Sequence, residues 1–385
     1  MRITGIRTLS LSRMHERERQ WFTATYRTVK ADCSIVIIQT DSELFGIGEA
    51  SAYGGPAEIS DWVSWLSPEL VGQDLMGDFP IIHPNGLSRS HDAAISGIDC
   101  ALWDLRGKTQ GKKVSSLISE DASSKVALYA SGGCSYDWRD DPRQLISEAQ
   151  GYIDQGYQAM KFRIGTQWDW DAVTVDKFLG LVRTLAGEVN GRIKLILDGN
   201  CRLDERQAFA IAEELEKLQF VWFEEPMPRN DVGAYARLNG AFSLPISGGE
   251  SFYTLEQFRP YFDNGAVDIV QPDAGICGAT EFLRIAGVAR RNGLRVCPHS
   301  WHNGLMMMAH AHLVAALPNA PFVERCMIQG PLQLGILKEP PRINNGILEL
   351  PDTPGFGVEP AESLEERFPF IEGHYGIQVN RPSQP

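Results

Sequence analysis

Three short apolar runs, each ending in a carboxylate, constrain this chain most. They read Leu-Ile-Leu-Asp-Gly-Asn, Val-Trp-Phe-Glu-Glu-Pro and Pro-Ile-Ser-Gly-Gly-Glu, and their carboxylates are Asp198, Glu224 and Glu250. Both intervals, from 198 to 224 and from 224 to 250, are 26 residues long, which suits one strand, one helix and two loops of a βαβ series. Because parallel barrel strands end on one face, the spacing predicts that the three carboxylates lie side by side.

Three adjacent negative charges are costly unless a cation neutralises them. Oxygen-only ligands suit a hard divalent ion, and Mg²⁺ is the first choice over Ca²⁺ because it keeps open positions for substrate and water. Mn²⁺ is the expected substitute. The alternative, solvated carboxylates at helix N-termini, is common for any one of them alone. All three stand at the end of an apolar strand, which favours the metal site.

From Lys125 onward the chain alternates between strand and helix signals. Strands are expected near 125–131, 159–164, 194–199, 221–225, 245–249, 268–272, 295–299 and 321–325. Amphipathic helical stretches such as 205–218 fill the gaps. Eight such units predict an α/β fold built on a (β/α) barrel rather than an open doubly wound sheet. No GxGxxG motif opens a helix, which counts against a dinucleotide site.

The N-terminal part has a different pattern. Apolar and polar residues alternate over 1–12, further strands are expected at 33–39 and 45–50, and helices at 59–70 and 93–117. These elements predict a small α+β domain over 1–122, followed by the barrel over 123–350. A Pro- and Gly-rich stretch then leads into a C-terminal segment, 351–385, which we expect to pack on the first domain.

Composition limits the partners and the compartment. The net charge of −13 argues against nucleic acid or an anionic membrane as the main partner, since both require a basic surface. It does not exclude a small anionic substrate, because a bound metal dominates the local field. Seven dispersed cysteines without a CxxC pair indicate reduced thiols. No secretory signal or membrane-spanning run is visible, so a cytoplasmic protein is expected.

Polar side chains at the other strand ends extend the predicted site. Lys161 and Arg163 are two residues apart, so both should face the barrel mouth and could hold a substrate carboxylate. Asp273 and His299 end consecutive strands, and a carboxylate that accepts from an imidazole N–H makes His299 a candidate acid or base. Glu324 could donate a hydrogen bond if it is kept protonated, or could simply pair with Arg325.

The loops after these strands carry the candidate substrate contacts. Asn200 follows the first carboxylate, and Trp301 and His302 belong to the loop after the seventh strand, where they could line a pocket. His310 and His312 lie in an expected helix and are interpreted as packing or surface residues.

These motifs resemble the enolase superfamily, in its mandelate racemase subgroup. The run Ala-Ile-Ser-Gly-Ile-Asp-Cys-Ala-Leu-Trp-Asp-Leu-Arg-Gly-Lys at 94–108 resembles the family's helix signature. The three carboxylate runs resemble its metal-ligand series, and the likeness covers essentially the whole chain.

The resemblance implies a capping domain over a modified (β/α)₇β barrel that binds Mg²⁺ through Asp198, Glu224 and Glu250. It also implies abstraction of a proton α to a carboxylate, with the His299–Asp273 dyad as one acid/base and Glu324 as a donor to the intermediate. Segments 14–27, with Arg19 and Trp21, and 51–56 resemble the loops that close over the substrate. By analogy with the family, a homo-oligomer is expected.

One position departs from the family pattern. Arg163 stands where the family usually has a second lysine that acts as a base, and arginine keeps its proton. Two-base racemisation is therefore disfavoured, and a one-base reaction by His299 fits better. We expect dehydration of a sugar acid, an aldonate or aldarate, to a 2-keto-3-deoxy acid. The alternatives are an epimerase, racemase or lactone cycloisomerase acting on a related hydroxy acid, and a catalytically silent metal-binding homologue.

Overall fold

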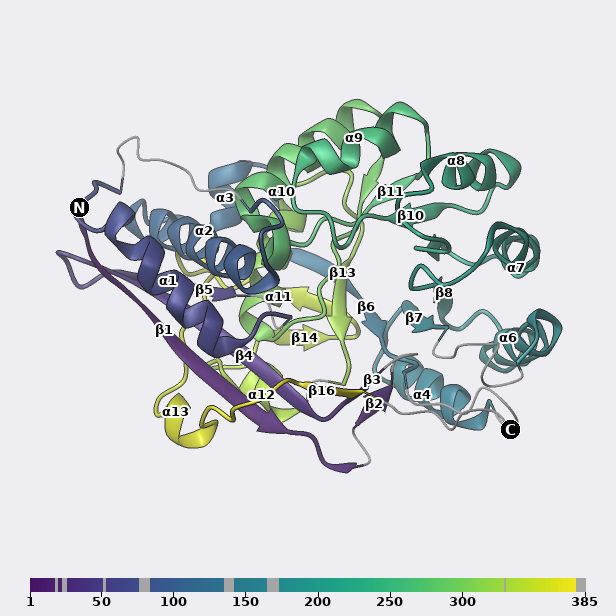
Figure 1. Ribbon diagram of the computed structural model, residues 1–385, viewed down its shortest axis with the longest axis horizontal. Coiled ribbons are helices and arrows are strands. Elements are labelled where there is room, and N and C mark those ends of the chain that lie inside the picture. Colours follow the sequence, from purple (N-terminus) through teal and green to yellow (C-terminus); the bar gives the residue numbers. More distant parts are fainter. Residues whose placement is uncertain are drawn as a thin grey trace.

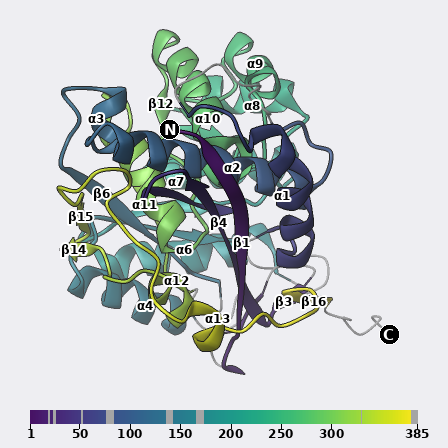
Figure 2. The same ribbon diagram turned by 90° about the vertical axis from the view of Figure 1, so that its left-hand side faces the viewer.

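The computed structural model describes residues 1–17, 20–22, 26–50, 53–75, 84–134, 142–164, 173–328 and 330–378. In Figure 1 the N-terminal sheet and helices (purple and blue) lie beside the barrel (teal and green), and the C-terminal segment (yellow) runs back along the N-terminal part. Turned by 90°, the same N-terminal elements lie in front of the barrel (Figure 2). None of the helices described in these ranges is long and apolar enough to cross a membrane.

Eight parallel strands build the barrel. They are β6 (Lys125–Ser131), β7 (Ala159–Arg163), β8 (Lys194–Asp198), β9 (Phe223–Glu224), β10 (Ile246–Gly248), β11 (Ile269–Val270), β12 (Arg295–Val296) and β13 (Val323–Cys326). Strands β6 to β12 pair in sequence order, and β13 pairs in parallel with β6, so the order returns to the first strand. All eight expected strands are present, several of them shorter than predicted.

In the described parts of the chain, seven helices alternate with these strands and give the predicted (β/α)₇β order. They are α4 (Arg143–Asp154), α6 (Val175–Val189), α7 (Glu205–Lys217), α8 (Val232–Ala241), α9 (Leu255–Asp263), α10 (Ala274–Arg291) and α11 (Gly304–Ala315), and a short α12 (Pro331–Gly335) follows β13. Helix α7 is an example of how the local sequence determines where these helices begin and which face they bury. Asp204 and Gln207 form a reciprocal capping box at its start, and its apolar face, predicted from the sequence, is buried.

The barrel interior is filled by side chains from most of its strands. One buried apolar cluster comprises Tyr129, Ala159, Ile196, Trp222, Ile269 and Cys297. A packed interior of this kind leaves no pore, so a ligand site can form only at an open end of the barrel.

The N-terminal part is an antiparallel sheet with helices on it. The sheet order is β1 (Ile3–Met14), β4 (Lys30–Thr40) and β5 (Phe45–Ala50), and α1 (Pro56–Leu70) and α2 (Arg89–Thr109) pack against these strands. The single helix predicted over 93–117 is wrong at 110–113, because α2 ends at Thr109 and a separate α3 (Val114–Ile118) follows. Gly111 adopts a left-handed backbone, φ 62°, which ends the helix at a position suited to glycine.

The C-terminal segment runs back to the N-terminal part. Its elements are α13 (Leu364–Arg367) and β16 (Gly376–Gln378), and β16 pairs with β3 (Tyr26–Thr28), which also pairs with β2 (Trp21–Phe22). Before this segment, β14 (Arg342–Asn344) and β15 (Ile347–Glu349) form an antiparallel hairpin, and β15 pairs with β6 of the barrel. The buried Lys30 ammonium donates to the carbonyls of Ile371 and Gly373 at 2.6 Å each. The boundaries at 122 and 350 stay predictions.

Two carboxylates of the N-terminal part cap barrel helices. Asp99 of α2 accepts from the backbone nitrogen of Thr280 at 2.8 Å, just after α10 is interrupted at Gly278 (φ 78°). Glu49 of β5 accepts from the backbone nitrogens of Asn303 and Met306 at 2.9 Å each. Since a helix start leaves unsatisfied N–H groups, these contacts fix the N-terminal part against α10 and α11, whose first residues border the site.

His312 of α11 should make stability depend on pH. Burial lowers the pKa of this imidazole from 6.5 to about 4, so the folded state binds the proton more weakly than the unfolded chain. The contribution of His312 is therefore complete above pH 6.5 and is lost as the pH falls from 6.5 to about 4, by up to about 3 kcal/mol. Denaturant titrations at several pH values should show a shallower loss in His312→Gln than in the wild type. Parallel pH dependences would contradict this assignment.

Candidate active site

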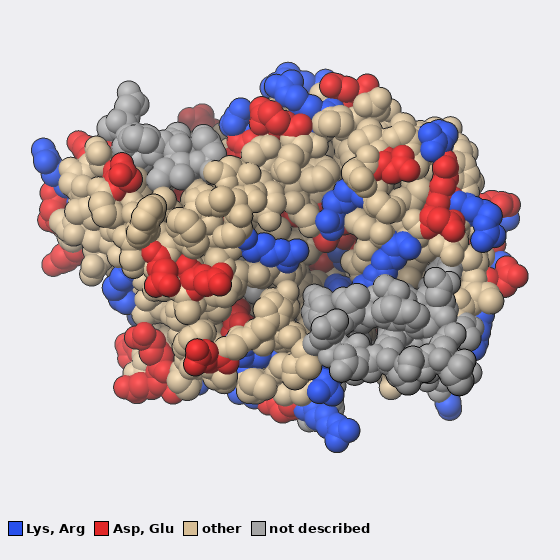
Figure 3. Space-filling view, in the orientation of Figure 1, with Lys and Arg blue, Asp and Glu red and all other residues tan. Residues whose placement is uncertain are grey.

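A cavity of about 230 Å³ lies at the carboxyl ends of the barrel strands, against the N-terminal part. Its lining comprises Trp21, Tyr53, Arg89, Asp92, Ala93, Lys161, Arg163, Asp198, Asn200, Arg202, Arg229, Glu250, Ser251, Tyr253, Gly275, Ile276, His299 and Trp301. Figure 3 shows Lys and Arg side chains gathered around a hollow near the centre of that face. Five of the lining residues are lysines or arginines, which suits an anionic ligand.

The three spaced carboxylates come from adjacent strands, as the spacing predicts. Asp198 of β8 is in register with Glu224 of β9, which is in register with Ser247 of β10, and Glu250 follows β10. Asp198 and Glu250 line the cavity, whereas Glu224 is fully buried beneath it.

Lys161 of β7 lies among these acidic groups. Its ammonium contacts Oε1 of Glu224, lies 2.9 Å from Oε1 of Glu324 and 4.0 Å from Oδ2 of Asp198. Burial alone would lower the pKa of Lys161, but the carboxylates outweigh it and raise that pKa well above its usual value. Lys161 therefore stays protonated in this arrangement, which disfavours it as a base.

Hydrogen bonds fix the carboxylates at the carboxyl ends of β8 and β9. Oε2 of Glu224 accepts from Nε2 of Gln271 at 2.8 Å and from the Trp222 indole at 3.2 Å. Asn200, held in a left-handed turn (φ 46°), donates to Asp198 through its backbone and its amide, at 2.8 Å each. Outer hydrogen bonds of this kind orient metal ligands.

Burial and mutual repulsion raise the pKa values of two of these carboxylates. Burial has the largest effect on Glu224 and raises its pKa, and the negative charges of Asp198 and Glu324 raise it further. The Lys161 ammonium opposes them, and the resulting pKa is about 7. Burial, followed by repulsion from the nearby Glu225 carboxylate, raises the pKa of Glu250 to about 8. A divalent cation on these oxygens would relieve the repulsion, and an all-oxygen donor set is the kind that Mg²⁺ takes. The residues present therefore fit such an ion.

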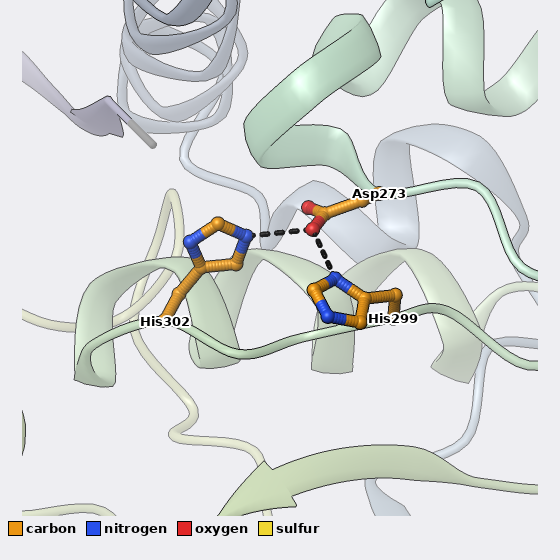
Figure 4. A group of neighbouring side chains, drawn as sticks. All are labelled: Asp273, His299 and His302. Atoms are coloured by element: carbon orange, nitrogen blue, oxygen red, sulfur yellow. Dashed lines mark hydrogen bonds and ion pairs between the residues drawn. The ribbon is translucent and has the colours of Figure 1, made fainter. Parts of the chain in front are cut away.

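Asp273 and His299 form the predicted pair (Figure 4). Oδ2 of Asp273 accepts from Nδ1 of His299 at 2.6 Å, and Nε2 of His299 lies 3.8 Å from Oε2 of Glu250 on the cavity side. Burial alone would lower the pKa of His299, but Glu250, Glu324 and Asp273 raise it to about 10. Nε2 of His299 therefore carries a proton that faces the cavity. A cation bound to the carboxylates would lower this pKa, so that the proton would be lost more easily.

Two predictions need correction, namely the position of His302 and the pairing of Glu324 with Arg325. His302 does not line the cavity, because its side chain is fully buried next to Asp273. Its Nε2 lies 2.7 Å from Oδ2 of Asp273 (Figure 4). Glu324 accepts from the backbone nitrogen of Ser300 at 2.7 Å and lies 2.9 Å from the Lys161 ammonium, and its role as a donor to an intermediate stays a prediction. Burial would raise its pKa, but Lys161 and His299 lower it to about 2. Its alternative partner is also wrong, since Arg325 contacts the hydroxyl of Tyr157.

Arg163 lies against aromatic rings on the cavity wall. Its guanidinium carbon is 4.4 Å from the Trp301 ring centre and 5.5 Å from that of Trp21, and both indoles are nearly buried. Arg163, Trp301, Trp21 and Asn200 all line the cavity, and their contacts with a substrate stay a prediction. Arg19 lies outside the described residues.

Several lining residues were not predicted. Arg89 reaches the cavity from the N-terminal part, and Arg229 follows β9 and pairs with Glu225 at 2.8 Å. Tyr53, by contrast, belongs to the predicted loop 51–56 and lines the cavity. Gln271, which is not part of the lining but donates to Glu224, had a usable signal, because it is a polar residue at the end of an apolar strand run, two positions before Asp273. Arg89 had none, since its approach depends on how the two parts of the chain pack.

The cluster of Asp273, His299 and His302 resembles a metal site by residue type. Its ligand atoms are already joined by hydrogen bonds of 2.6 and 2.7 Å. A carboxylate can only accept, so each imidazole donates a proton to it. The cluster is therefore a hydrogen-bonded network rather than a second metal centre.

This fold and this site define a capped-barrel enzyme with a carboxylate cluster facing a His–Asp pair. A family model described as enolase C-terminal domain-like matches residues 144–364, and the mandelate racemase/muconate lactonizing enzyme N-terminal domain matches residues 9–119. The chain belongs to the mandelate racemase and muconate lactonizing enzyme family of the enolase superfamily. Members of this superfamily generally use Mg²⁺.

Characterised relatives cover nearly the whole chain. Arabinonate dehydratase of Saccharolobus solfataricus is 31% identical over 86% of this chain and 89% of its own length. D-galactarolactone cycloisomerase of Agrobacterium fabrum is 29% identical over 93% of this chain and 96% of its own length. The crystal structure of the 3,6-anhydro-D-galactonate cycloisomerase from Zobellia galactanivorans is similar with a TM-score of 0.80 and 28% identity, over 96% of this chain and 99% of that chain.

Proposed function

We propose that this protein dehydrates a sugar acid to a 2-keto-3-deoxy acid. The observation that carries the proposal is the His299–Asp273 pair facing the carboxylate cluster, in a cavity where Arg163 replaces the second lysine base. A single acid/base suits an elimination, which needs proton removal and proton delivery in turn. The relatives named as arabinonate, galactonate and gluconate dehydratases support the substrate class.

The residues act in a definite order. Nε2 of His299 takes the proton from the carbon next to the substrate carboxylate, while Asp273 stabilises the imidazolium. His299 then returns a proton to the β-hydroxyl, which leaves as water, and the enol that remains becomes the 2-keto acid. Mg²⁺ held by Asp198, Glu224 and Glu250 would supply the positive charge that stabilises the enolate oxygens. Lys161, kept protonated, supplies further positive charge at the same end of the cavity.

A lactone cycloisomerase is the second candidate, and the relatives from Agrobacterium fabrum and Zobellia galactanivorans favour it. The chemistry overlaps, because both reactions can remove an α-proton and expel an oxygen from the β-carbon. In a lactone the expelled oxygen stays tethered to the product, so no water is released. Product mass therefore separates the two reactions.

Mono-acid and di-acid sugars, together with their lactones, should be incubated with the protein and Mg²⁺ and scored for 2-keto acid by derivatisation and mass. The proposal predicts a product lighter than the acid by one water, formed with Mg²⁺ and not with EDTA. A keto product of unchanged mass from a lactone would indicate the cycloisomerase. Absence of any keto product across the library would contradict both.

Arg163→Lys should weaken substrate binding without creating a second base. Lysine keeps the charge but loses the planar stacking on Trp301 and the forked contact with a carboxylate. We expect KM to rise about tenfold, for a loss of about 1–2 kcal/mol, with a smaller change in kcat. Steady-state kinetics with the best acid from the library measure this. A rise in α-proton exchange without loss of binding would show that a lysine here restores base chemistry and that Arg163 is no anchor.

A further inference from the structure

We propose that His302 is a positioning residue, which holds Asp273 from behind so that this carboxylate in turn holds the imidazole of His299. The inference rests on the proposed acid/base role of His299 and adds a residue to it. His302 touches neither the cavity nor any carboxylate of the cluster among the described contacts, so its effect must pass through Asp273.

The carboxylate of Asp273 is fixed by three donors. Oδ2 accepts from Nδ1 of His299 at 2.6 Å and from Nε2 of His302 at 2.7 Å, and Oδ1 accepts from the backbone nitrogen of Gly275 at 2.7 Å. Figure 4 shows the two imidazoles approaching one oxygen from different sides. Rotation of the carboxylate would break a contact with at least one donor. His302 therefore restricts the one group that sets the ring orientation of His299.

Gly275 leaves the space that His302 occupies. A Cβ at position 275 would lie 2.7 Å from Nε2 of His302 and 3.1 Å from Oδ1 of Asp273, which is closer than side chains tolerate. A larger residue at 275 would push the imidazole away from the carboxylate. The chain thus combines a glycine at the start of α10 with a histidine before α11, and their fit places the second donor on Asp273.

The backbone of His302 is held from both parts of the chain. Its neighbour Asn303 donates to Glu49 of β5 through its backbone nitrogen at 2.9 Å and its amide at 3.1 Å. Gln333 donates to the carbonyl of His302 at 3.3 Å. The ring of Tyr53 lies edge-on to His302, with centres 5.8 Å apart. Packing of the N-terminal part against the barrel therefore fixes the position of His302, and through His302 the orientation of the His299–Asp273 pair.

Two substitutions separate this role from simple packing. Glutamine can place its amide Nε2 where the imidazole Nε2 lies and still donate to Asp273. Methionine fills a similar volume but has no donor. We expect His302→Met to lower kcat about 10- to 100-fold, as for other outer partners of functional ligands, with KM changed less than about twofold. His302→Gln should keep kcat within about threefold of wild type.

His312→Gln is the matched control, because it removes another fully buried imidazole. His312 lies on α11, away from the cavity, whereas His302 lies before that helix. Its folded protein should keep the wild-type kcat at neutral pH. Equal losses in His302→Gln and His302→Met, with intact folding, would show that His302 only packs. Wild-type kcat in His302→Met would overturn the proposal directly.

A second readout does not depend on turnover. In protein labelled with ¹⁵N-histidine, the network predicts two downfield imidazole N–H protons, from His299 and His302, that both move in Asp273→Asn. His302→Met should remove one and shift or broaden the other, and His302→Gln should leave the His299 signal near its place. An unmoved His299 signal in His302→Met overturns the proposal, as does a zinc ion bound between the three side chains. If wild-type protein turns over no sugar acid, the dehydratase assignment fails while this measurement still decides the role of His302.

Discussion

In His299→Asn, the kcat for formation of the 2-keto acid should fall by at least about 10³-fold. One positioned acid/base contributes about 10²–10⁴-fold, and here the same imidazole is assigned both proton transfers. Asparagine keeps a polar group next to Asp273 but cannot take a proton from the α-carbon of the substrate or deliver one to its β-hydroxyl oxygen. The measurement is kcat for the best sugar acid at saturating Mg²⁺.

The loss must be separated from damage to the metal site, since Nε2 of His299 lies 3.8 Å from Glu250. Mg²⁺ affinity, measured by calorimetry, should change little in His299→Asn, and the thermal unfolding of the variant should stay near that of wild type. Residual kcat within tenfold of wild type would show that another group moves the proton, and the one-base mechanism would be wrong.

Glu250→Gln should remove both Mg²⁺ binding and activity. The substitution keeps the size of the side chain but replaces a charged ligand by a neutral amide in a site built from three carboxylates. Metal polarisation of an enolate is worth several kcal/mol, so we expect kcat/KM to fall by about 10³-fold or more. Calorimetric titration with Mg²⁺ and steady-state kinetics measure the two effects on the same preparation.

Glu256→Gln makes the same chemical change at an exposed position on α9 and serves as its control. It should bind Mg²⁺ and turn over substrate like the wild type. Because burial makes an ionised Glu250 costly without a cation, Glu250→Gln should also unfold at the same or a higher temperature in EDTA. Undiminished Mg²⁺ binding in Glu250→Gln would remove this residue from the metal site.

The repeated strands and their carboxylates could be predicted because their signals are local. A run of apolar residues that ends in Asp or Glu can be read directly from the chain, and barrel geometry carries all such ends to one face. Lys161 and Arg163 followed from two-residue alternation along β7, and the pairing of Asp273 with His299 followed from consecutive strands. Each of these inferences needed only the sequence and one rule of strand geometry.

The environment of His302 and Glu324 could not be predicted in the same way. Whether His302 faces the cavity or Asp273 depends on the space left by Gly275 and on the contact between Asn303 and Glu49, which is about 250 positions away along the chain. The charge of Glu324 depends on Lys161, which lies on β7, two strands away from β13 in the barrel. Such properties arise from tertiary packing and from the balance of burial and neighbouring charges.

The dehydratase proposal is tested most directly by turnover of the best sugar acid in D₂O with Mg²⁺, scored by mass spectrometry and NMR. We expect a 2-keto-3-deoxy acid that has lost one water and whose formation stops in EDTA. In His299→Asn we expect no product and no deuterium at the α-carbon of the remaining acid. Deuterium exchange or keto product that persists in His299→Asn at the wild-type rate, or that proceeds unchanged in EDTA, would contradict the proposal.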